Sequence, residues 1–234
     1  MRFSYSTYVQ QTFPARATAV ILFDEANDRA DTSTASEAFC QIAAARLAEG
    51  PEGEFPEIQA WRRAFSTMGL KPTQYRCAAE ALIRRYRKER NLPSLHPLVD
   101  LCNAASIAFA VPIAVFDLDR IAGDLIVRQA DGTERYANFA GGIEHPEPDE
   151  IIFADDAGNA HARRWANRQS KLSTVGPNTT KAMIIAEGLH DNAADDLERL
   201  ITQLGDAVRD SFGTTLTSAL LLRPNAVFQH PLKD

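Results

Sequence analysis

The stretch from Leu95 to Arg128, LHPLVDLCNAASIAFAVPIAVFDLDRIAGDLIVR, decides how this chain folds. Pro97 suits the first turn of a helix, and apolar residues then recur at helical spacing as far as Phe109. The rest of the helix circumference is also largely apolar, which is typical of a helix buried inside a protein. Two short apolar segments follow it. The stretch therefore predicts one buried helix, a tight connection and two strands.

Two polar residues, Asp100 and Asn103, lie three positions apart on this predicted helix. At that spacing their side chains share one edge and could reach the same partner or the same cavity. They could equally bond neighbouring backbone groups and fix the packing of the helix, because buried polar side chains need partners. The sequence leaves both interpretations open.

The string VDLCNAASIAFAVPIAVFDLDRIAGDLIVRQADGTERY resembles the editing (B3/B4) domain of the phenylalanyl-tRNA synthetase beta subunit. That family carries a V-D-x-T-N helix, then a proline, an F-D-L-D turn, and a strand ending in V-R-x-A with a following G-E. The matching residues here are Val99, Asp100, Asn103, Pro112, Phe116, Asp117, Leu118, Asp119, Val127, Arg128, Ala130, Gly132 and Glu134. The resemblance implies an α/β (α+β) fold, a B3/B4-like domain with mixed β-sheets and flanking helices.

We expect this single domain to span residues 1–234. Its parts would be a helical region to about residue 95, a pocket region from about 95 to 190, and a C-terminal helix and strand. The resemblance also implies roles for three residues. Asn103 would be the polar anchor of the pocket, Asp100 would orient neighbouring groups, and Glu187 would read the hydroxyl of a mischarged tyrosine.

The chain departs from the family pattern in its pocket. Where the family reads Q-P-x-H-A-F-D, this chain reads V-P-I-A-V-F-D, so Ala114 replaces a histidine. Cys102 stands where the family has a threonine, and bulky polar residues at 163–170 replace a glycine-rich loop. These changes put the tyrosine specificity, and the reaction itself, in question.

Length and charge limit what the resemblance can mean. A chain of 234 residues is too short for a complete synthetase subunit. Its net charge of −6 argues against a protein that holds nucleic acid over a broad surface, so we expect no DNA partner and only local RNA contact. Three widely spaced cysteines indicate neither disulfides nor a metal site, and no metal or nucleotide cofactor is indicated. Without a leader or an apolar run long enough to span a bilayer, we expect a cytoplasmic protein with no membrane partner.

Periodicity predicts the other elements. Helices are predicted over 34–47, from Pro56 to Gly69, over 74–90 and over 194–212. Strands are predicted over 17–23, 125–127, 134–139, 150–153, 161–165, within 180–189, and over 216–222.

Two basic segments are candidates for contact with tRNA. The outer face of the predicted helix 74–90 carries Arg84, Arg85 and Lys88, which could meet phosphates or simply face water. The second segment contains Arg163, Arg164, Trp165, Asn167 and Arg168. It could grip a phosphate and stack the terminal adenosine, or form a surface hairpin whose arginines pair with Asp155 and Asp156.

Two function classes follow from these expectations. The resemblance implies a free-standing editing domain that hydrolyses the ester linking a wrong amino acid to tRNA. The alternative is a non-catalytic module that binds RNA or a small amino-acid-like ligand, which Ala114 and the missing glycine loop favour. The sequence does not show which amino acid is involved, and it leaves the oligomeric state open.

Overall fold

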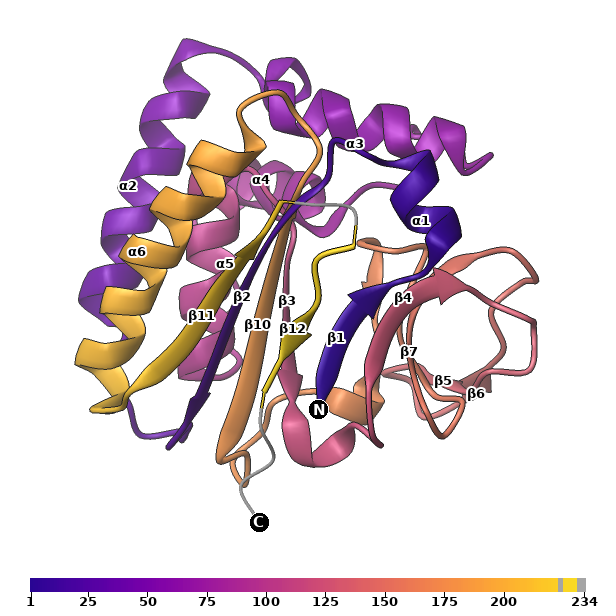
Figure 1. The fold of residues 1–234 in the computed structure, drawn as a ribbon. Helices are drawn as coiled ribbons and strands as arrows, with labels where there is room; N and C mark the ends of the chain where they lie inside the picture. Colours follow the sequence, from indigo (N-terminus) through magenta and orange to yellow (C-terminus); the bar gives the residue numbers. More distant parts are fainter. Residues whose placement is uncertain (223–224, 231–234) are drawn as a thin grey trace.

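The computed structural model describes residues 1–222 and 225–230. Two β-sheets lie next to each other, and helices cover them (Figure 1). The larger sheet has the strand order β12 (Phe228–Gln229), β1 (Arg2–Tyr5), β4 (Leu125–Gln129), β7 (Ile151–Asp155), β8 (Ala160–Arg163) and β9 (Arg168–Gln169). The smaller sheet has the order β11 (Leu216–Leu221), β2 (Ala17–Asp24), β10 (Lys181–Gly188) and β3 (Ile113–Asp117). A separate hairpin joins β5 (Tyr136–Ala137) to β6 (Ile143–Glu144). The structure confirms the predicted mixed α/β class.

The smaller sheet is apolar on both faces, and its central strands are buried on both sides. Successive side chains of a strand point to opposite faces. On β10, Ala182, Ile184 and Ala186 therefore meet the helices, whereas Met183, Ile185 and Glu187 face the larger sheet. A buried carboxylate thus lies on an otherwise apolar face between the sheets.

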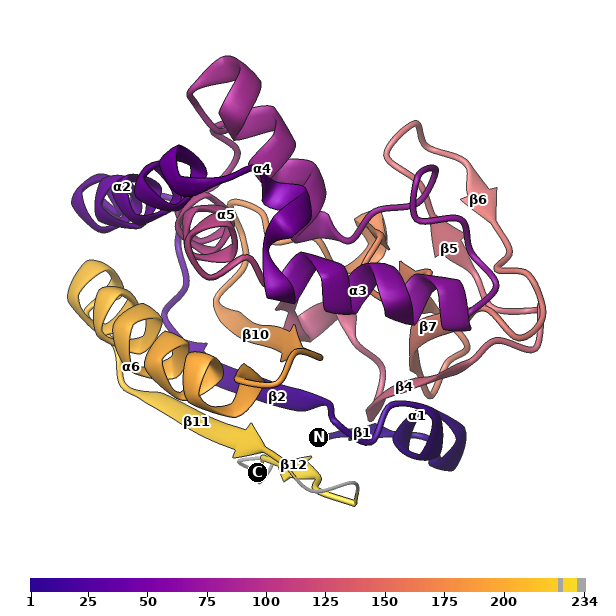
Figure 2. The same cartoon turned by 90° about the horizontal axis from the view of Figure 1, so that it is seen from above.

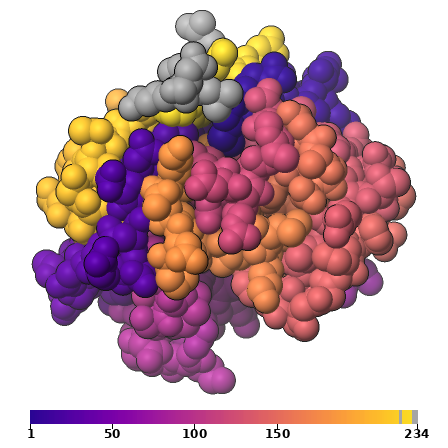
Figure 3. Space-filling model, turned by 90° about the horizontal axis from the view of Figure 1, so that it is seen from below, coloured from indigo at the N-terminus to yellow at the C-terminus, as the bar shows by residue number. Residues whose placement is uncertain are grey.

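Helices cover the outer face of the smaller sheet, as Figure 2 shows from above. They are α2 (Ser33–Glu49), α5 (Pro97–Phe109) and α6 (Ala193–Phe212). The helix α5 is buried along most of its length, as its apolar circumference predicts. The helices α3 (Pro56–Thr67) and α4 (Ala78–Glu89) pack instead into the core between the sheets. In the space-filling view from below, the middle of the chain, coloured magenta to salmon, covers the centre and one side of the visible face (Figure 3).

Most predicted elements are confirmed, with several differences. Periodicity did not predict β1, the short helix α1 (Thr7–Thr12), or the two-residue strands β6, β9 and β12. The helix α4 begins at Ala78 rather than at residue 74, because the backbone N–H of Ala78 and the carbonyl of Arg76 bond the segment 166–167. The predicted strand 134–139 shrinks to β5, since Glu134 leaves the strand to bond Arg128 and the backbone of residues 131–132. The predicted strand 161–165 ends at Arg163.

No helix in the described ranges combines the length and the apolar character that crossing a bilayer requires.

Candidate functional site

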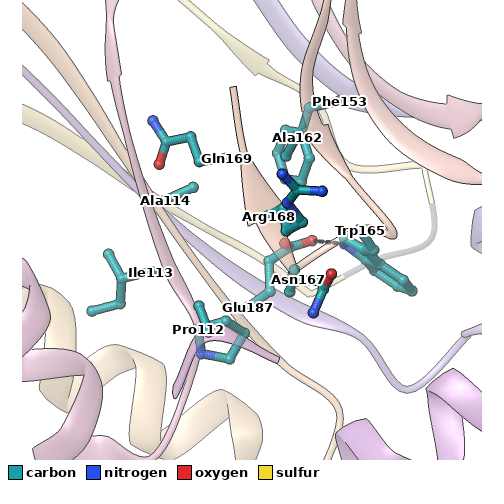
Figure 4. A pocket seen from close by; sticks show the side chains of 12 residues that line it. Pro112, Ile113, Ala114, Phe153, Ala162, Trp165, Asn167, Arg168, Gln169 and Glu187 are labelled. Carbon is teal, nitrogen blue, oxygen red and sulfur yellow. Dashed lines mark hydrogen bonds between the residues drawn. The ribbon is translucent and has the colours of Figure 1, made fainter. Parts of the chain in front are cut away.

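A small cavity lies between the two sheets, where β10 ends and β3 begins (Figure 4). Its volume is about 50 Å³. The wall is mostly apolar, with polar side chains from β10 and from the segment after β8. The lining residues are Ala78, Pro112, Ile113, Ala114, Phe153, Ala162, Trp165, Ala166, Asn167, Arg168, Gln169 and Glu187. Ala114, at the position of the family's histidine, is thus part of the wall.

Glu187 supplies the carboxylate of this cavity, and strand pairing places it there. Glu187 lies opposite Thr18 of the neighbouring strand β2, and its backbone N–H donates a hydrogen bond to the carbonyl of Pro112, just before β3. Only 3% of Glu187 is exposed. Its Oε1 atom accepts hydrogen bonds from the Tyr5 hydroxyl at 2.6 Å and from the Trp165 indole nitrogen at 2.8 Å. The fold therefore holds this carboxylate in one fixed orientation.

Burial dominates the protonation of this cluster. Burial raises the pKa of Glu187, although the bonds from Tyr5 and Trp165 and the charge of Arg16 act in the opposite direction. Burial and the neighbouring carboxylate also raise the pKa of Tyr5 well above its ordinary value. Tyr5 therefore remains a neutral phenol that donates to Glu187. The buried Arg16 guanidinium lies 3.5 Å from the centroid of the Tyr5 ring and bonds Thr18.

The segment after β8 turns the Trp165 indole inward. Arg164 and Trp165 both adopt positive φ angles, 47° and 57°, which side chains other than glycine rarely accept. The indole is completely buried, and its ring centroid lies 5.0 Å from that of Trp61 and 4.9 Å from that of Phe13. One of the two interpretations of this segment had Trp165 stack on a base at the surface. Instead it packs among aromatic side chains and positions Glu187.

Arg163 belongs to a buried ion-pair network. Its guanidinium bonds Glu150 at 2.8 Å and Glu144 at 2.7 Å, and 6% of its side chain is exposed. Burial alone would raise the pKa of Glu150, but the bonds from Arg163 outweigh burial and hold that pKa below its ordinary value. Both expectations for Arg163 were therefore wrong. It is not open to a phosphate, and its partners are not Asp155 and Asp156.

The next residues reach the cavity and its rim. Asn167 and Gln169 line the wall, and each directs its amide nitrogen to a backbone carbonyl, at 2.7 Å from Arg76 and 2.6 Å from Val115. Arg168 also lines the cavity, but 47% of its side chain is exposed, and its guanidinium lies 3.7 Å from Glu144 and 5.6 Å from the centroid of the Tyr136 ring. Arg164 lies over the ring of Tyr75 and does not line the cavity.

The two polar residues of α5 do not join this site. Asp100 accepts hydrogen bonds from the Ser94 hydroxyl and from the backbone N–H groups of Leu95 and His96. It therefore fixes the loop that leads into the helix, as the structural interpretation proposed. Asn103 is half-buried and is not among the lining residues. The expected placement of Asn103 and Asp100 in the pocket was wrong.

The basic face of α4 is exposed and partly paired. Arg84 bonds Glu52 at 3.1 Å, and Arg85 bonds Glu89 at 2.8 Å. Within the described residues Lys88 forms no ion pair. Because Ala78 at the start of α4 lines the cavity, a rise of about 1.5 Å per residue puts this face roughly 9 to 15 Å along the helix from it.

Three side chains elsewhere have metal-binding atoms close together. The nearest ligand atoms of Glu57, His190 and Asp196 lie within 4.8 Å of one another. Arg46 bonds both oxygens of Glu57, and Arg199 and His190 bond Asp196. The two arginines already balance the carboxylates, so the group is an ion-pair network.

Sequence reasoning missed part of the site. Tyr5, Arg16 and Thr18 belong to the Glu187 cluster, but they lie more than 160 positions away from it in the chain. An alternating strand pattern shows which residues share a face, and it does not show which strands pack against that face. The one available signal was Thr18, a polar residue inside the apolar run ATAVILF.

Comparisons with known proteins show what this chain is similar to. The chain is similar to phenylalanine–tRNA ligase beta subunits from Shewanella oneidensis (27% identity, covering 38% of this chain and 11% of that protein), Anaeromyxobacter dehalogenans (30%, 44% and 13%) and Pectobacterium atrosepticum (25%, 56% and 18%). The chain thus spans less than a fifth of the length of these relatives. An N-terminal fragment of the phenylalanyl-tRNA synthetase beta subunit from Pyrococcus horikoshii aligns with a TM-score of 0.48 and 10% identity, over 92% of this chain and 49% of the fragment.

The family assignment comes from a model of one domain. The B3/4 domain model matches residues 60–203, which is more than half of the chain. This range includes α5, the F-D-L-D turn, the segment after β8 and Glu187, and it contains all of the residues that line the cavity. The resemblance inferred from the sequence is confirmed, and the chain belongs to the B3/4 domain family.

Proposed function

We propose that this protein binds the aminoacyl end of tRNA and hydrolyses the ester of a mischarged aminoacyl-tRNA. The observation that carries the proposal is the cavity of a B3/4 domain with a fixed, buried carboxylate inside and a half-exposed arginine, Arg168, in its wall. The relatives with this domain are named as phenylalanine–tRNA ligase beta subunits, so tRNA is the partner class that the family suggests.

The reaction makes modest demands on the site. Water adds its hydroxyl to the ester carbonyl, the bond to the ribose oxygen breaks, and that oxygen takes the proton. Because the ester is already activated, orientation and exclusion of competing substrates supply much of the catalysis. We assign recognition of the aminoacyl group to Glu187 and Asn167, and contact with the terminal phosphate to Arg168. Arg163, Asp100 and Asn103 have no role in this scheme.

A deacylation assay tests this proposal. The full chain is incubated with a panel of mischarged tRNAs, and the loss of labelled amino acid from the tRNA is followed. We expect hydrolysis of at least one pair above the spontaneous rate, and a large loss of that activity in Glu187→Gln and Arg168→Ala. Arg209→Ala, an exposed arginine on α6, is the matched control. If every pair decays at the spontaneous rate, the proposed hydrolysis is wrong.

Ala114 favours a second candidate, a non-catalytic binding module. An alanine at this point of the wall provides no acid, base or hydrogen bond where the family has a histidine. In that case a stable 3′-aminoacylamino-3′-deoxyadenosine would raise the melting temperature of the chain, because a ligand that binds only the folded state stabilises it. Stabilisation without hydrolysis of any tRNA in the panel would select this candidate.

A further inference from the structure

The polar wall of the cavity presents acceptor atoms. Asn167 and Gln169 both turn their amide nitrogens to backbone carbonyls, and the Trp165 indole N–H is bonded to Glu187. Figure 4 shows the amide oxygen of Asn167 on the side of Glu187, and the amide of Gln169 beyond Ala114 and pointing away from the carboxylate. The amide oxygens, unlike the nitrogens, form no hydrogen bond with any described residue. A ligand group that enters here must therefore donate hydrogen bonds.

Glu187 adds a second acceptor beside Asn167 and a negative charge. Both of its bonds, from Tyr5 and from Trp165, end on Oε1. In Figure 4 the other carboxylate oxygen points away from the indole. Because a carboxylate has about four acceptor positions on its two oxygens, Oε2 has capacity for a ligand. Among the described lining residues the one cation is Arg168, whose guanidinium lies 3.7 Å from Glu144 and over the Tyr136 ring and forms no ion pair with Glu187.

We propose that the cavity is a receptor for a primary ammonium group, which Glu187 and Asn167 would hold through their oxygen atoms. An ammonium has three N–H donors and no acceptor, so it can bond both oxygens and pair its charge with the carboxylate. A hydroxyl donates once, so reading a tyrosine hydroxyl would leave one of the two acceptors without a partner. A carboxylate or a phosphate would meet only acceptors and a like charge.

The size of the cavity agrees with this ligand. A buried water needs about 10–15 Å³ on the same measure, so 50 Å³ holds an ammonium with its adjacent carbon atoms and excludes a nucleotide. The ribose and phosphate would then remain outside, beside Arg168. The assignment to an aminoacyl group rests on the proposed function. The chemistry of the receptor also fits the side-chain ammonium of a lysine.

The Trp165 indole gives a direct readout, because its N–H bonds the same carboxylate. We would label the full chain with ¹⁵N-tryptophan, assign the two indole signals with Trp165→Phe, and titrate three small ligands. L-Alaninamide carries an α-ammonium, Nα-acetyl-L-lysinamide carries a side-chain ammonium, and N-acetyl-L-alaninamide carries neither. We expect a saturable shift of the Trp165 signal with at least one amine and none with the neutral amide.

Variants test whether Glu187 is the receptor group. Glu187→Gln keeps an oxygen that can accept from Tyr5 and Trp165, and it removes the charge. Loss of one charge-assisted hydrogen bond should weaken amine binding by about tenfold or more. Glu89→Gln on the exposed face of α4 is the matched control and should bind normally. A neutral amide that shifts the signal as strongly as the amines, or no shift with either amine, would overturn the proposal.

The same chemistry separates this inference from the proposed hydrolysis. If at least one of the two amines binds but no tRNA is deacylated, the ammonium receptor is supported and the proposed hydrolysis is wrong. If the protein hydrolyses an aminoacyl-tRNA and its N-acetylated form equally fast, the hydrolytic function stands and the ammonium receptor falls.

Discussion

Glu187 connects sequence, fold and function at the scale of one residue. The alternation of β10 points it between the sheets, and three partners from distant parts of the chain hold or surround it there. Burying a carboxylate is unfavourable unless hydrogen bonds and a counter-charge compensate. The bonds from Tyr5 and Trp165 and the nearby Arg16 provide only part of that compensation, which is why the pKa stays raised. A cationic ligand would complete it.

This residue makes a prediction about stability and pH. A raised pKa in the folded state means that the folded protein binds more protons than the unfolded one between the ordinary value of 4.5 and the raised value. The contribution of Glu187 to stability is therefore present below pH 4.5 and is lost as pH rises through the raised pKa. Glutamine does not ionise, so Glu187→Gln avoids this loss of stability, which is about 1.4 kcal/mol for each unit by which folding raises the pKa. In urea unfolding from pH 4.5 to 8, the free energy of unfolding of the variant should increase relative to that of the wild type. A difference between the two that does not change with pH would contradict this.

Arg163 and Arg168 should separate stability from binding. Arg163→Met leaves Glu150 buried without its cation, and breaking such a pair costs about 3–5 kcal/mol. Arg168→Met removes an exposed cation whose contact with Glu144 is 3.7 Å, so the expected change is within about 1 kcal/mol. Chemical unfolding of both variants measures the difference. Equal losses of stability would show that Arg163 is not part of the core.

At the scale of elements, α5 depends on Asp100 for the way it begins. The carboxylate bonds the backbone N–H groups of Leu95 and His96 just before the helix. Asp100→Ala should lower the free energy of unfolding by about 1 kcal/mol, as loss of a cap does. Hydrogen exchange should accelerate at residues 95 and 96, while exchange at an amide of β10 follows only the global change. Unchanged exchange at these two residues would refute the capping role.

Elements with a local cause could be predicted from the sequence. The helix α5 and the strand β10 follow from their own apolar patterns, and the hairpin of β7 and β8 follows from Asp155 to Gly158. Features that depend on contacts between distant residues were not predicted. The start of α4 depends on hydrogen bonds to residues 166–167. The inward turn of Trp165 depends on positive φ angles at two residues that are not glycine, so the sequence does not indicate it.

The site follows the same division. Glu187 was found because the family carries a glutamate on the matching strand, and Asn167 and Arg168 were found through the density of polar groups after β8. Their neighbour Arg163 was misassigned, because its acidic partners come from residues 144 and 150. Tyr5 was missed because β1 joins the core only through its place in the larger sheet.

At the scale of the whole molecule, the proposed function predicts a path for tRNA from the cavity along α4. The exposed face of α4 offers local positive charge on an acidic protein, at about 9 to 15 Å from the cavity. Lys88→Glu should therefore weaken tRNA binding and reduce its salt dependence. Arg209→Glu on α6, which changes the total charge equally, is the control. Filter binding at several salt concentrations would show equal effects of both variants if α4 has no part in binding.

The most direct test of the central claim is a crystal structure of the protein with a stable 3′-aminoacylamino-3′-deoxyadenosine. We predict that the ammonium of the ligand contacts Oε2 of Glu187 and that the ribose lies outside the cavity beside Arg168. A ligand bound elsewhere, or an ammonium that points into solvent while the cavity stays closed, would contradict it.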